Sequence, residues 1–568
     1  MSVAATAVGF APAADLDRFL GDPTDPASPM SFTRALERDR AAEFPLEAAE
    51  ALNEWGVHRF YVPSAFGGRL DDVLTPLLLM RNVARRDVTA AVGHGKTVLG
   101  AICAWAAADA SADQMARIVL SGDPVSWGLT EQGRGSDIAS STTSATIGPA
   151  GIVLDGHKWP IGNATRGRAV TVLARTDERP GPRSLSLVLV DKNAVDPTTV
   201  GYRPRRPLHG IRGADISGVE FHGTRVGADA LIGPAGHGLE LVLKSLQLTR
   251  TLCAALSLGA GDQAIALAIG EGVGRSDAAA RAVVADSVAD LLLAEAVAYA
   301  GARCVHTAPE EMALVSAFVK FLVPDSVDLL FRELTATIGA RAQLATGGFA
   351  RFQKASRDNR VVGIFDGNSV VNLNVVINEF ANIGRADDVD VEAVIGGLAG
   401  PPSPATFDMS RLRLITRRGS SVLRALPELA ARVEDGRVHV DVADAARRLA
   451  AEWHVVRDAA VAAERAPQPP ASQFVIAERL TLLFGAAACL ALYLAHRDRA
   501  VDGDGIGDLW ADDLWVRAVL ARVLARLGLD AHAPAPAAEL YAAAAGRVAA
   551  GAPVTLLSGW WHEGGAHS

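Results

Sequence analysis

Hydrophobic positions recur at helical spacing in the first part of the chain. Phe32 and Leu36, and then Ala48, Leu52 and Trp55, follow one another mostly at steps of three or four residues. This spacing places such residues on one face of a helix. The pattern continues to about residue 120, where short β-rich runs separated by Gly, Pro or Asp replace it. We therefore predict a helical region followed by a region of strands.

The strand region extends from about residue 125 to 228. The runs that predict strands are residues 127–130, 144–146, 152–154, 169–174 and 185–190. So many short runs between turn residues favour an antiparallel barrel or sandwich. From Gly236 to about Ile395, Ala- and Leu-rich segments with helical spacing return and are joined at Gly residues. This second pattern is typical of an antiparallel helical bundle.

A linker and a further helical region complete the predicted organisation. Residues 396–404 are rich in Gly and Pro, as linkers are. The chain is thus predicted to be an α+β multidomain protein. Its predicted parts are a flexible N-terminal tail (1–30), a helical N-terminal domain (31–124), a middle β domain (125–229), a C-terminal helical bundle (230–395) and an additional helical domain (396–568).

Composition narrows the classes of function. The 568 residues are 49% hydrophobic and 21% charged, which is typical of a globular protein. A net charge of −9 argues against a general nucleic-acid binder. The four cysteines lie far apart, as expected of reduced core residues in a cytoplasmic protein. The most apolar run, residues 480–495, is shorter than the ~20 residues that span a bilayer, so we expect a buried helix and no transmembrane segment.

No metal site is predicted. Residues 502–513 begin like a calcium-binding loop. However, Ile506 occupies the fifth position and Asp513 the twelfth, where such loops need an oxygen ligand and a bidentate Glu. We interpret this segment as an acidic surface turn.

The stretch from residue 127 to 137 carries the first candidate chemistry. It reads Trp-Gly-Leu-Thr-Glu-Gln-Gly-Arg-Gly-Ser-Asp. Gly133 and Gly135 allow a tight loop whose backbone N–H groups face outward, and Thr130 and Ser136 add hydroxyl groups at its ends. Such a loop can donate hydrogen bonds to an oxygen-rich ligand. An ordinary junction between a strand and a turn has the same pattern, so this loop alone does not identify a site.

Four separate motifs, in the same order, resemble those of the acyl-CoA dehydrogenase family. They are residues 127–137, Gly156-His157-Lys158-Trp159, residues 219–233, and Arg357-Asp358 followed by Ile364-Phe365-Asp366-Gly367. The resemblance covers roughly residues 30 to 390, and the extra C-terminal region is similar to that of long-chain members. It implies a helical N-domain, a β-barrel or sandwich, a four-helix bundle, and FAD-dependent oxidation of an acyl thioester between Cα and Cβ.

The resemblance also implies the roles of individual residues. Asp366 stands where the family has its catalytic base, and a base near the α-proton is what this oxidation requires. The β-hydrogen leaves as hydride, which side chains cannot accept, so a redox cofactor is obligatory. The implied flavin contacts are Trp127, Leu129, Thr130, Gly135, Ser136, Trp159, Ile161, Gly162 and Asn368. The implied substrate contacts are Ser136, Thr249, Arg250, Phe365 and Gly367.

The chain departs from the family pattern at several places, including Pro160 in place of a Trp and Asn368 in place of a Thr. Asp366 replaces a Glu and is one methylene shorter, which withdraws the carboxylate by about 1.5 Å. Gly162 replaces a flavin-bonding Thr. Residues 270–275 replace the family's Arg-x-x-Phe-Gly segment, and residues 339–342 replace its Gly-Gly-x-Gly segment. The last two changes affect the dinucleotide half of the expected FAD site.

Alternatives therefore remain for the activity. One is a flavin-dependent oxidase or monooxygenase on the same scaffold, and another is a degenerate flavoprotein with a binding role. The expected partners are an acyl thioester of coenzyme A or of a carrier protein, and either an electron-acceptor flavoprotein or oxygen. By analogy with long-chain family members, the assembly is expected to be a homodimer.

Overall fold

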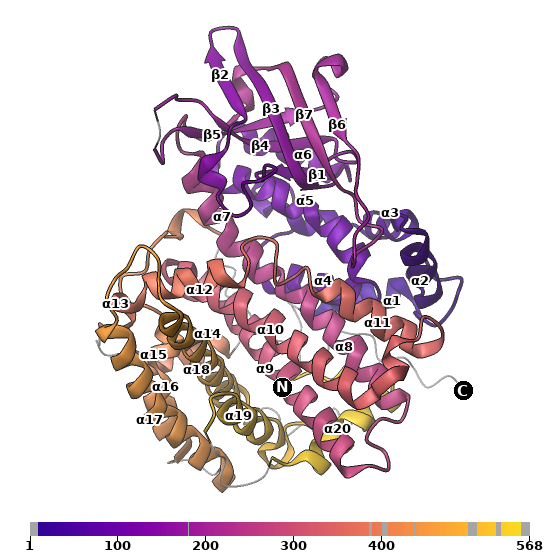
Figure 1. Cartoon of the computed structure of the whole chain (residues 1–568), viewed down its shortest axis with the longest axis vertical. Coiled ribbons are helices and arrows are strands. Elements are labelled where there is room, and N and C mark those ends of the chain that lie inside the picture. Colours follow the sequence, from indigo (N-terminus) through magenta and orange to yellow (C-terminus); the bar gives the residue numbers. More distant parts are fainter. Residues whose placement is uncertain are drawn as a thin grey trace.

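The computed structural model describes residues 10–179, 181–385, 389–399, 407–434, 438–497, 508–529 and 535–557. Figure 1 shows the strands gathered at one end of the long axis and the helices filling the rest of the molecule. The fold class predicted from the sequence is confirmed. The linker segment 400–404 and the first half of the acidic turn, residues 502–507, lie outside the described residues.

Six α-helices precede the sheet in the described part of the chain. They are α1 (Ala11–Leu20), α2 (Phe32–Ala41), α3 (Leu46–Trp55), α4 (Leu74–Ala84), α5 (Val88–Ala107) and α6 (Ala110–Leu120). Asp87 caps the N-terminus of α5: its side chain accepts a hydrogen bond from the Thr89 amide at 2.9 Å. Such a cap supplies an acceptor to one of the first amides, which have no partner inside the helix.

The prediction of a flexible tail over residues 1–30 is wrong for residues 11–30. Ala13, Leu16 and Leu20 lie on one face of α1 and are completely buried or nearly so. The Asn82 side chain donates to the carbonyl of Ala13 at 2.7 Å. This apolar face and its hydrogen bond hold α1 against α4, so the segment is part of the helical core. Residues 1–9 lie outside the described part of the chain.

The middle region is one eight-stranded sheet. Its strands are β1 (Val125–Gly128), β2 (Ser144–Gly148), β3 (Gly151–Gly162), β4 (Ala169–Arg175), β5 (Leu185–Asp191), β6 (Val200–Arg203), β7 (Ile216–Val226) and β8 (Leu231–Ile232). The order is β6-β7-β3-β2-β4-β5-β8, with β1 paired to β4. The β1–β4 pair is parallel, which corrects the expectation of a purely antiparallel sheet. Strand β1 follows helix α6 and not a hairpin, so its direction is not set by a neighbouring turn.

Helix α5 packs closely on this sheet. The Thr171 hydroxyl of β4 donates to the carbonyl of Gly100 in α5 at 2.7 Å. A Cβ at Gly100 would lie 2.7 Å from the carbonyl oxygen of Ser126 in β1, so only glycine permits this approach. Strand β1 ends at Gly128, so Leu129 and Thr130, which we expected in the strand, lie after it. Residues 127–137 and the neighbouring segment 159–162, which carry most of the expected flavin contacts, are called the flavin wall below. The packing of α5 on β1 attaches this flavin wall to the helical region.

The helical bundle follows the sheet. Its helices are α7 (Gly238–Leu252), α8 (Ala254–Gly270), α9 (Ala278–Thr307), α10 (Met312–Ile338), α11 (Gly347–Asn359), α12 (Ser369–Asn378), α13 (Phe380–Ile383) and α14 (Val391–Leu398). The longest, α9 and α10, pack along each other. Both are almost completely buried over their central turns.

The C-terminal helices cover one side of α9 and α10 (Figure 1). They are α15 (Ser421–Arg424), α16 (Leu426–Glu434), α17 (Val440–Ala462), α18 (Ala471–His496), α19 (Leu514–Arg526) and α20 (Ala537–Ala549). The apolar run 480–495 lies in α18, which begins at Ala471, before the run. Residues 238–270 and 471–496 are long and apolar enough to cross a membrane, but most of each apolar window is buried within the protein, as in core helices.

Candidate functional site

The loop after β1 presents unpaired hydrogen-bond donors. Gly133 and Gly135 have φ values of +81° and +55°, in the left-handed region that favours glycine. Among the described residues, the amides of Gly133, Gly135 and Ser136 and the hydroxyls of Thr130 and Ser136 have no hydrogen-bond partner. These donors fit a ligand rich in oxygen and nitrogen acceptors, as a flavin is. The residues present therefore fit the isoalloxazine half of FAD.

A buried ion pair that the sequence did not reveal holds this loop in place. Glu131 accepts hydrogen bonds from the backbone amides and hydroxyls of Thr142 and Thr143, at 2.7 to 2.9 Å, and from the Ser141 hydroxyl. Its carboxylate also pairs with the Lys158 ammonium at 2.8 Å. Burial alone would raise the pKa of Glu131, but Lys158 and these donors hold that pKa well below its ordinary range. The only sequence feature that pointed to Lys158 was the Gly-His-Lys-Trp motif.

Replacing Glu131 with Gln should destabilise the protein. The substitution keeps the side-chain shape but leaves the Lys158 ammonium buried without an anion, which costs about 3 kcal/mol of unfolding free energy. Urea denaturation measures this loss.

The stability that Glu131 contributes depends on pH. Because folding lowers the pKa of Glu131, this contribution is fully present above about pH 4.3, the unfolded value, and is lost progressively as the pH falls from there through the lowered pKa of the folded protein. The control is Glu220→Gln, which breaks a half-exposed pair with Arg203 and should cost less than about 1 kcal/mol. Equal losses in both variants would contradict the prediction.

Asp366 lies in the turn between α11 and α12. Its φ is +56°, and that of Gly367 is +94°. Among non-glycine residues, Asp and Asn adopt such positive φ values most readily. The Asp366 carboxylate accepts a weak hydrogen bond from the Cys253 thiol at 3.5 Å. Asn368 begins α12, where its side-chain oxygen accepts from the Val371 amide.

Two buried cations fix the backbone around Asp366 without pairing with its carboxylate. Arg250 donates to the carbonyl oxygen of Asp366 at 3.1 Å. Lys320 donates to the carbonyls of Val362 and Gly367. Burial lowers the pKa of Arg250 to about 10 and that of Lys320 to about 8. Arg250 is thus a positioning residue beneath the turn, and it does not face solvent as a helix-surface arginine would.

An apolar pocket opens beside this turn, with about 490 Å³ of empty space that includes open solvent. The lining residues come from the short helix η2 (Val57–Tyr61), α4, α5, α7, α8, the junction of α7 and α8, and the turn itself. They are Tyr61, Pro76, Met80, Ala91, Val92, Gly95, Lys96, Val98, Leu99, Thr249, Leu252, Cys253, Leu256 and Phe365. Of the expected substrate contacts, the structure therefore brings Thr249 and Phe365 to one cavity, next to Asp366. Its apolar wall suits an acyl chain.

Lys96 connects this cavity to the flavin wall. A Cβ at Gly162 would lie 2.9 Å from the Lys96 Cγ, so the lysine chain occupies the space that a larger residue at 162 would need. Its ammonium lies 4.1 Å from the centre of the Phe365 ring. The two halves of the expected site, the wall at Gly162 and the turn at Asp366, are therefore neighbours. None of the motifs that resemble the family included Lys96.

Arg357 and Asp358, which resemble a family motif, are structural clamps here. The Arg357 guanidinium binds Asp39 at 2.7 Å and the carbonyl of His209 at 2.9 Å. Asp358 accepts from the Ile211 amide and pairs with Lys354, both at 2.6 Å. These contacts join α11 to α2 and to the loop before β7, and so they set the position of the turn that carries Asp366.

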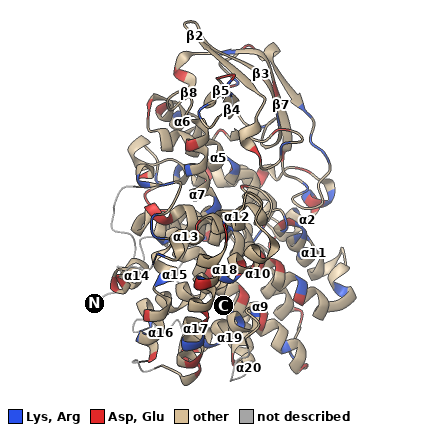
Figure 2. Ribbon diagram, turned by 60° about the vertical axis from the view of Figure 1, so that its left-hand side comes forward, with Lys and Arg blue, Asp and Glu red and all other residues tan. Residues whose placement is uncertain are grey.

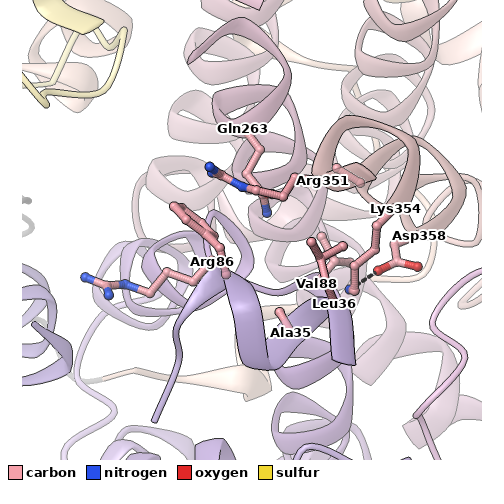
Figure 3. A pocket seen from close by; sticks show the side chains of 10 residues that line it. Ala35, Leu36, Arg86, Val88, Gln263, Arg351, Lys354 and Asp358 are labelled. Atoms are coloured by element: carbon pink, nitrogen blue, oxygen red, sulfur yellow. Dashed lines mark hydrogen bonds and ion pairs between the residues drawn. The ribbon is translucent and has the colours of Figure 1, made fainter. Parts of the chain in front are cut away.

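A second, narrow pocket lies between α2, the start of α5, α8 and α11. Figure 3 shows that its carboxylate, Asp358, is paired with Lys354. Its Arg86 is bound to Asp17 at 2.8 Å, and its Arg351 stacks on the ring of Phe32. With these charged groups already engaged, this cavity belongs to the domain interface rather than to the candidate site.

The two segments that replace the family's dinucleotide-binding motifs lie in different parts of the helical bundle. Residues 270–275 form the turn after α8, where the Tyr541 hydroxyl of α20 donates to the Val273 carbonyl at 2.9 Å. A C-terminal helix of the same chain therefore packs on this turn. Residues 339–342 fall in a short 3-10 helix after α10.

Comparisons with known proteins agree with this geometry. Residues 126–224 match the model of the acyl-CoA dehydrogenase middle domain, and residues 236–380 match that of the acyl-CoA dehydrogenase C-terminal domain. A probable acyl-CoA dehydrogenase of Mycobacterium leprae is 25% identical over 348 residues, which is 59% of this chain and 88% of that protein.

Solved structures show the same fold. An acyl-CoA dehydrogenase from Bacillus anthracis, complexed with FAD, is similar with a TM-score of 0.65 and 16% identity, over 95% of this chain and 94% of that one. Butyryl-CoA dehydrogenase from Megasphaera elsdenii has a TM-score of 0.57 and 22% identity, over 65% of this chain and 95% of that one. The first likeness extends across the C-terminal helices as well.

Proposed function

Because this chain belongs to the acyl-CoA dehydrogenase family, we propose that it oxidises an acyl thioester between Cα and Cβ, with Asp366 as the base. Members of the family are FAD-dependent oxidoreductases, and the chain is one of them. When bound, FAD supplies the acceptor for the β-hydrogen. The observation that carries the proposal is the carboxylate of Asp366 beside an apolar cavity that also borders the flavin wall.

The side chains of the site divide the remaining tasks. Asp366 takes the α-proton, and Arg250 and Lys320 hold the turn so that the carboxylate faces the cavity. The apolar wall accommodates the acyl chain and excludes water from it. The loop after β1, including Gly135, and the strand at Trp159 and Ile161 would hold the flavin ring. Ser136 at the loop's end would also reach the substrate.

The same scaffold supports proposals about partners. The thioester carrier is coenzyme A or a carrier protein, and the electron acceptor is a second flavoprotein or oxygen. We propose a homodimer in the cytoplasm, because the C-terminal helices already cover one side of α9 and α10. Figure 2 shows basic and acidic residues interspersed over the elements in view, which does not favour a nucleic-acid-binding role.

The test is anaerobic reduction of the bound flavin. Purified protein reconstituted with FAD should hold one FAD per chain, released on denaturation and identified by chromatography. Saturated acyl-CoA thioesters of several lengths should bleach its visible absorbance. Re-oxidation by an artificial electron acceptor but not by air would indicate a dehydrogenase, whereas fast re-oxidation by air would indicate an oxidase. Recovery of no flavin, or of FMN only, would contradict the proposal, as would unchanged absorbance with every thioester.

A further inference from the structure

Lys96 is the one charged side chain among the described residues that line the apolar cavity. It lies near the middle of α5, which packs on the sheet and is held rigidly there. Its methylene groups pass Gly162, and its ammonium lies over the face of Phe365, the residue before Asp366. The ammonium is therefore close to the atoms on which the base would act.

This ammonium has no anionic partner in the part of the chain that the structure describes. It makes no ion pair and no hydrogen bond there; its one recorded contact is with the Phe365 ring. The contact with an aromatic face is attractive but weak compared with an ion pair in an apolar site. The Asp366 carboxylate, the nearest candidate, instead faces the Cys253 thiol.

The surroundings of the turn carry two more positive charges. Arg250 and Lys320 both donate to backbone carbonyls of the turn. Burial lowers the pKa of Lys320; Cys253 and the Asp366 carboxylate oppose this shift, and the positive charges of Arg250 and Lys96 add to it. Three cations thus surround one carboxylate, while the rest of the cavity wall is apolar. The excess positive charge at this site would be balanced by a bound anion.

We propose that Lys96 binds a carboxylate carried by the acyl group, so that the substrate is the thioester of a short dicarboxylic acid. The inference rests on the proposed function, which places Cα of the acyl group next to Asp366. Because Lys96 lies over Phe365, its partner must be attached a few carbons from Cα, not on the distant thioester carrier. Lys96 then determines specificity by an ion pair formed inside an otherwise apolar cavity.

The experiment compares two series of coenzyme A thioesters. One series carries straight-chain monocarboxylic acyl groups, and the other carries dicarboxylic acyl groups of the same carbon number. The FAD-reconstituted wild type, Lys96→Met, Lys96→Arg and the surface control Lys244→Met are assayed anaerobically for kcat/KM, with binding measured in parallel by calorimetry. Lys244 lies on α7, where it pairs with Glu240.

The wild type should prefer the dicarboxylic series. In Lys96→Met the ratio of kcat/KM values, dicarboxylic over monocarboxylic, should fall about 10²-fold, the scale for losing one partner of a buried charge pair. Lys96→Arg should restore part of the ratio, and Lys244→Met should leave it unchanged. A wild type that prefers the monocarboxylic series overturns the inference. Equal losses for both series in Lys96→Met also overturn it, since they indicate a role toward the flavin.

Failure of the proposed function would look different. If no thioester of either series bleaches the flavin, the dehydrogenase activity is wrong. The calorimetric comparison still decides the inference in that case, because the ratio of binding constants between the two series depends on Lys96 and not on turnover. Equal binding of both series by the wild type would then reject the role of Lys96.

Discussion

Replacing Asp366 with Asn will lower the rate of flavin reduction by substrate about 10²-fold or more, the usual scale for loss of a general base. Asn keeps the size of the side chain and tolerates the positive φ of this turn, so the backbone stays in place. Arg250 and Lys320 hold carbonyl oxygens, not the carboxylate, and their hydrogen bonds survive the change. Stopped-flow absorbance under anaerobic conditions measures the rate, and the FAD content of the variant should equal that of the wild type.

Asp366→Glu is the informative companion. Glu extends the carboxylate by about 1.5 Å and is less suited than Asp to a φ of +56°. We expect this variant to lose rate as well, because the turn is built for the shorter residue. The control is Glu539→Gln, an exposed carboxylate on α20, which should leave the rate unchanged. Normal flavin reduction by Asp366→Asn would remove this residue from the mechanism.

Replacing Arg81 with Leu will lower the unfolding free energy by about 3–5 kcal/mol, the range for removing one partner from a buried ion pair. Arg81 of α4 is completely buried and binds both carboxylate oxygens of Asp262 in α8 at 2.9 Å. It also pairs with Glu295 in α9, which accepts from the Leu556 amide at 2.6 Å. The leucine variant would leave two buried carboxylates without a cation.

Urea denaturation followed by circular dichroism measures this loss. Arg81→Lys should retain part of the stability, since it keeps the charge but cannot form the two-pronged contact with Asp262. The control Arg18→Leu removes an exposed pair with Asp15 and should cost less than about 1 kcal/mol. A loss for Arg81→Leu as small as that for Arg18→Leu would show that the buried network contributes little.

Local patterns in the sequence predicted the larger elements well. The runs at residues 169–174 and 185–190 correspond to β4 and β5, because both are short apolar segments with turn residues on either side. The helical spacing after Gly236 corresponds to α7 and the helices that follow. The N-terminal residues 11–20 were the clearest error. Their small apolar residues resemble a loose tail until α4 is present to bury Ala13, Leu16 and Leu20.

The candidate site was predicted only in part, because contacts between segments far apart in the sequence leave no local pattern. Asp366 and the loop after β1 were found because each is a contiguous motif, although the role of Asp366 stays a prediction. The partnership of Glu131 with Lys158 was not, since the two residues are separated in sequence and meet only through the fold of the sheet. Arg250 could not be distinguished from a surface arginine until the turn at Asp366 was placed above it.

The sequence by itself determined the succession of helices and strands and the resemblance to the acyl-CoA dehydrogenase family, since these depend on local spacing and contiguous motifs. Only the tertiary structure decided where charge lies in the site. Lys96 lies near Asp366 because α5 packs against β1, and Lys320 lies there because α10 runs beneath the turn. Contacts between segments so far apart are set by packing of whole elements, and no local pattern records them.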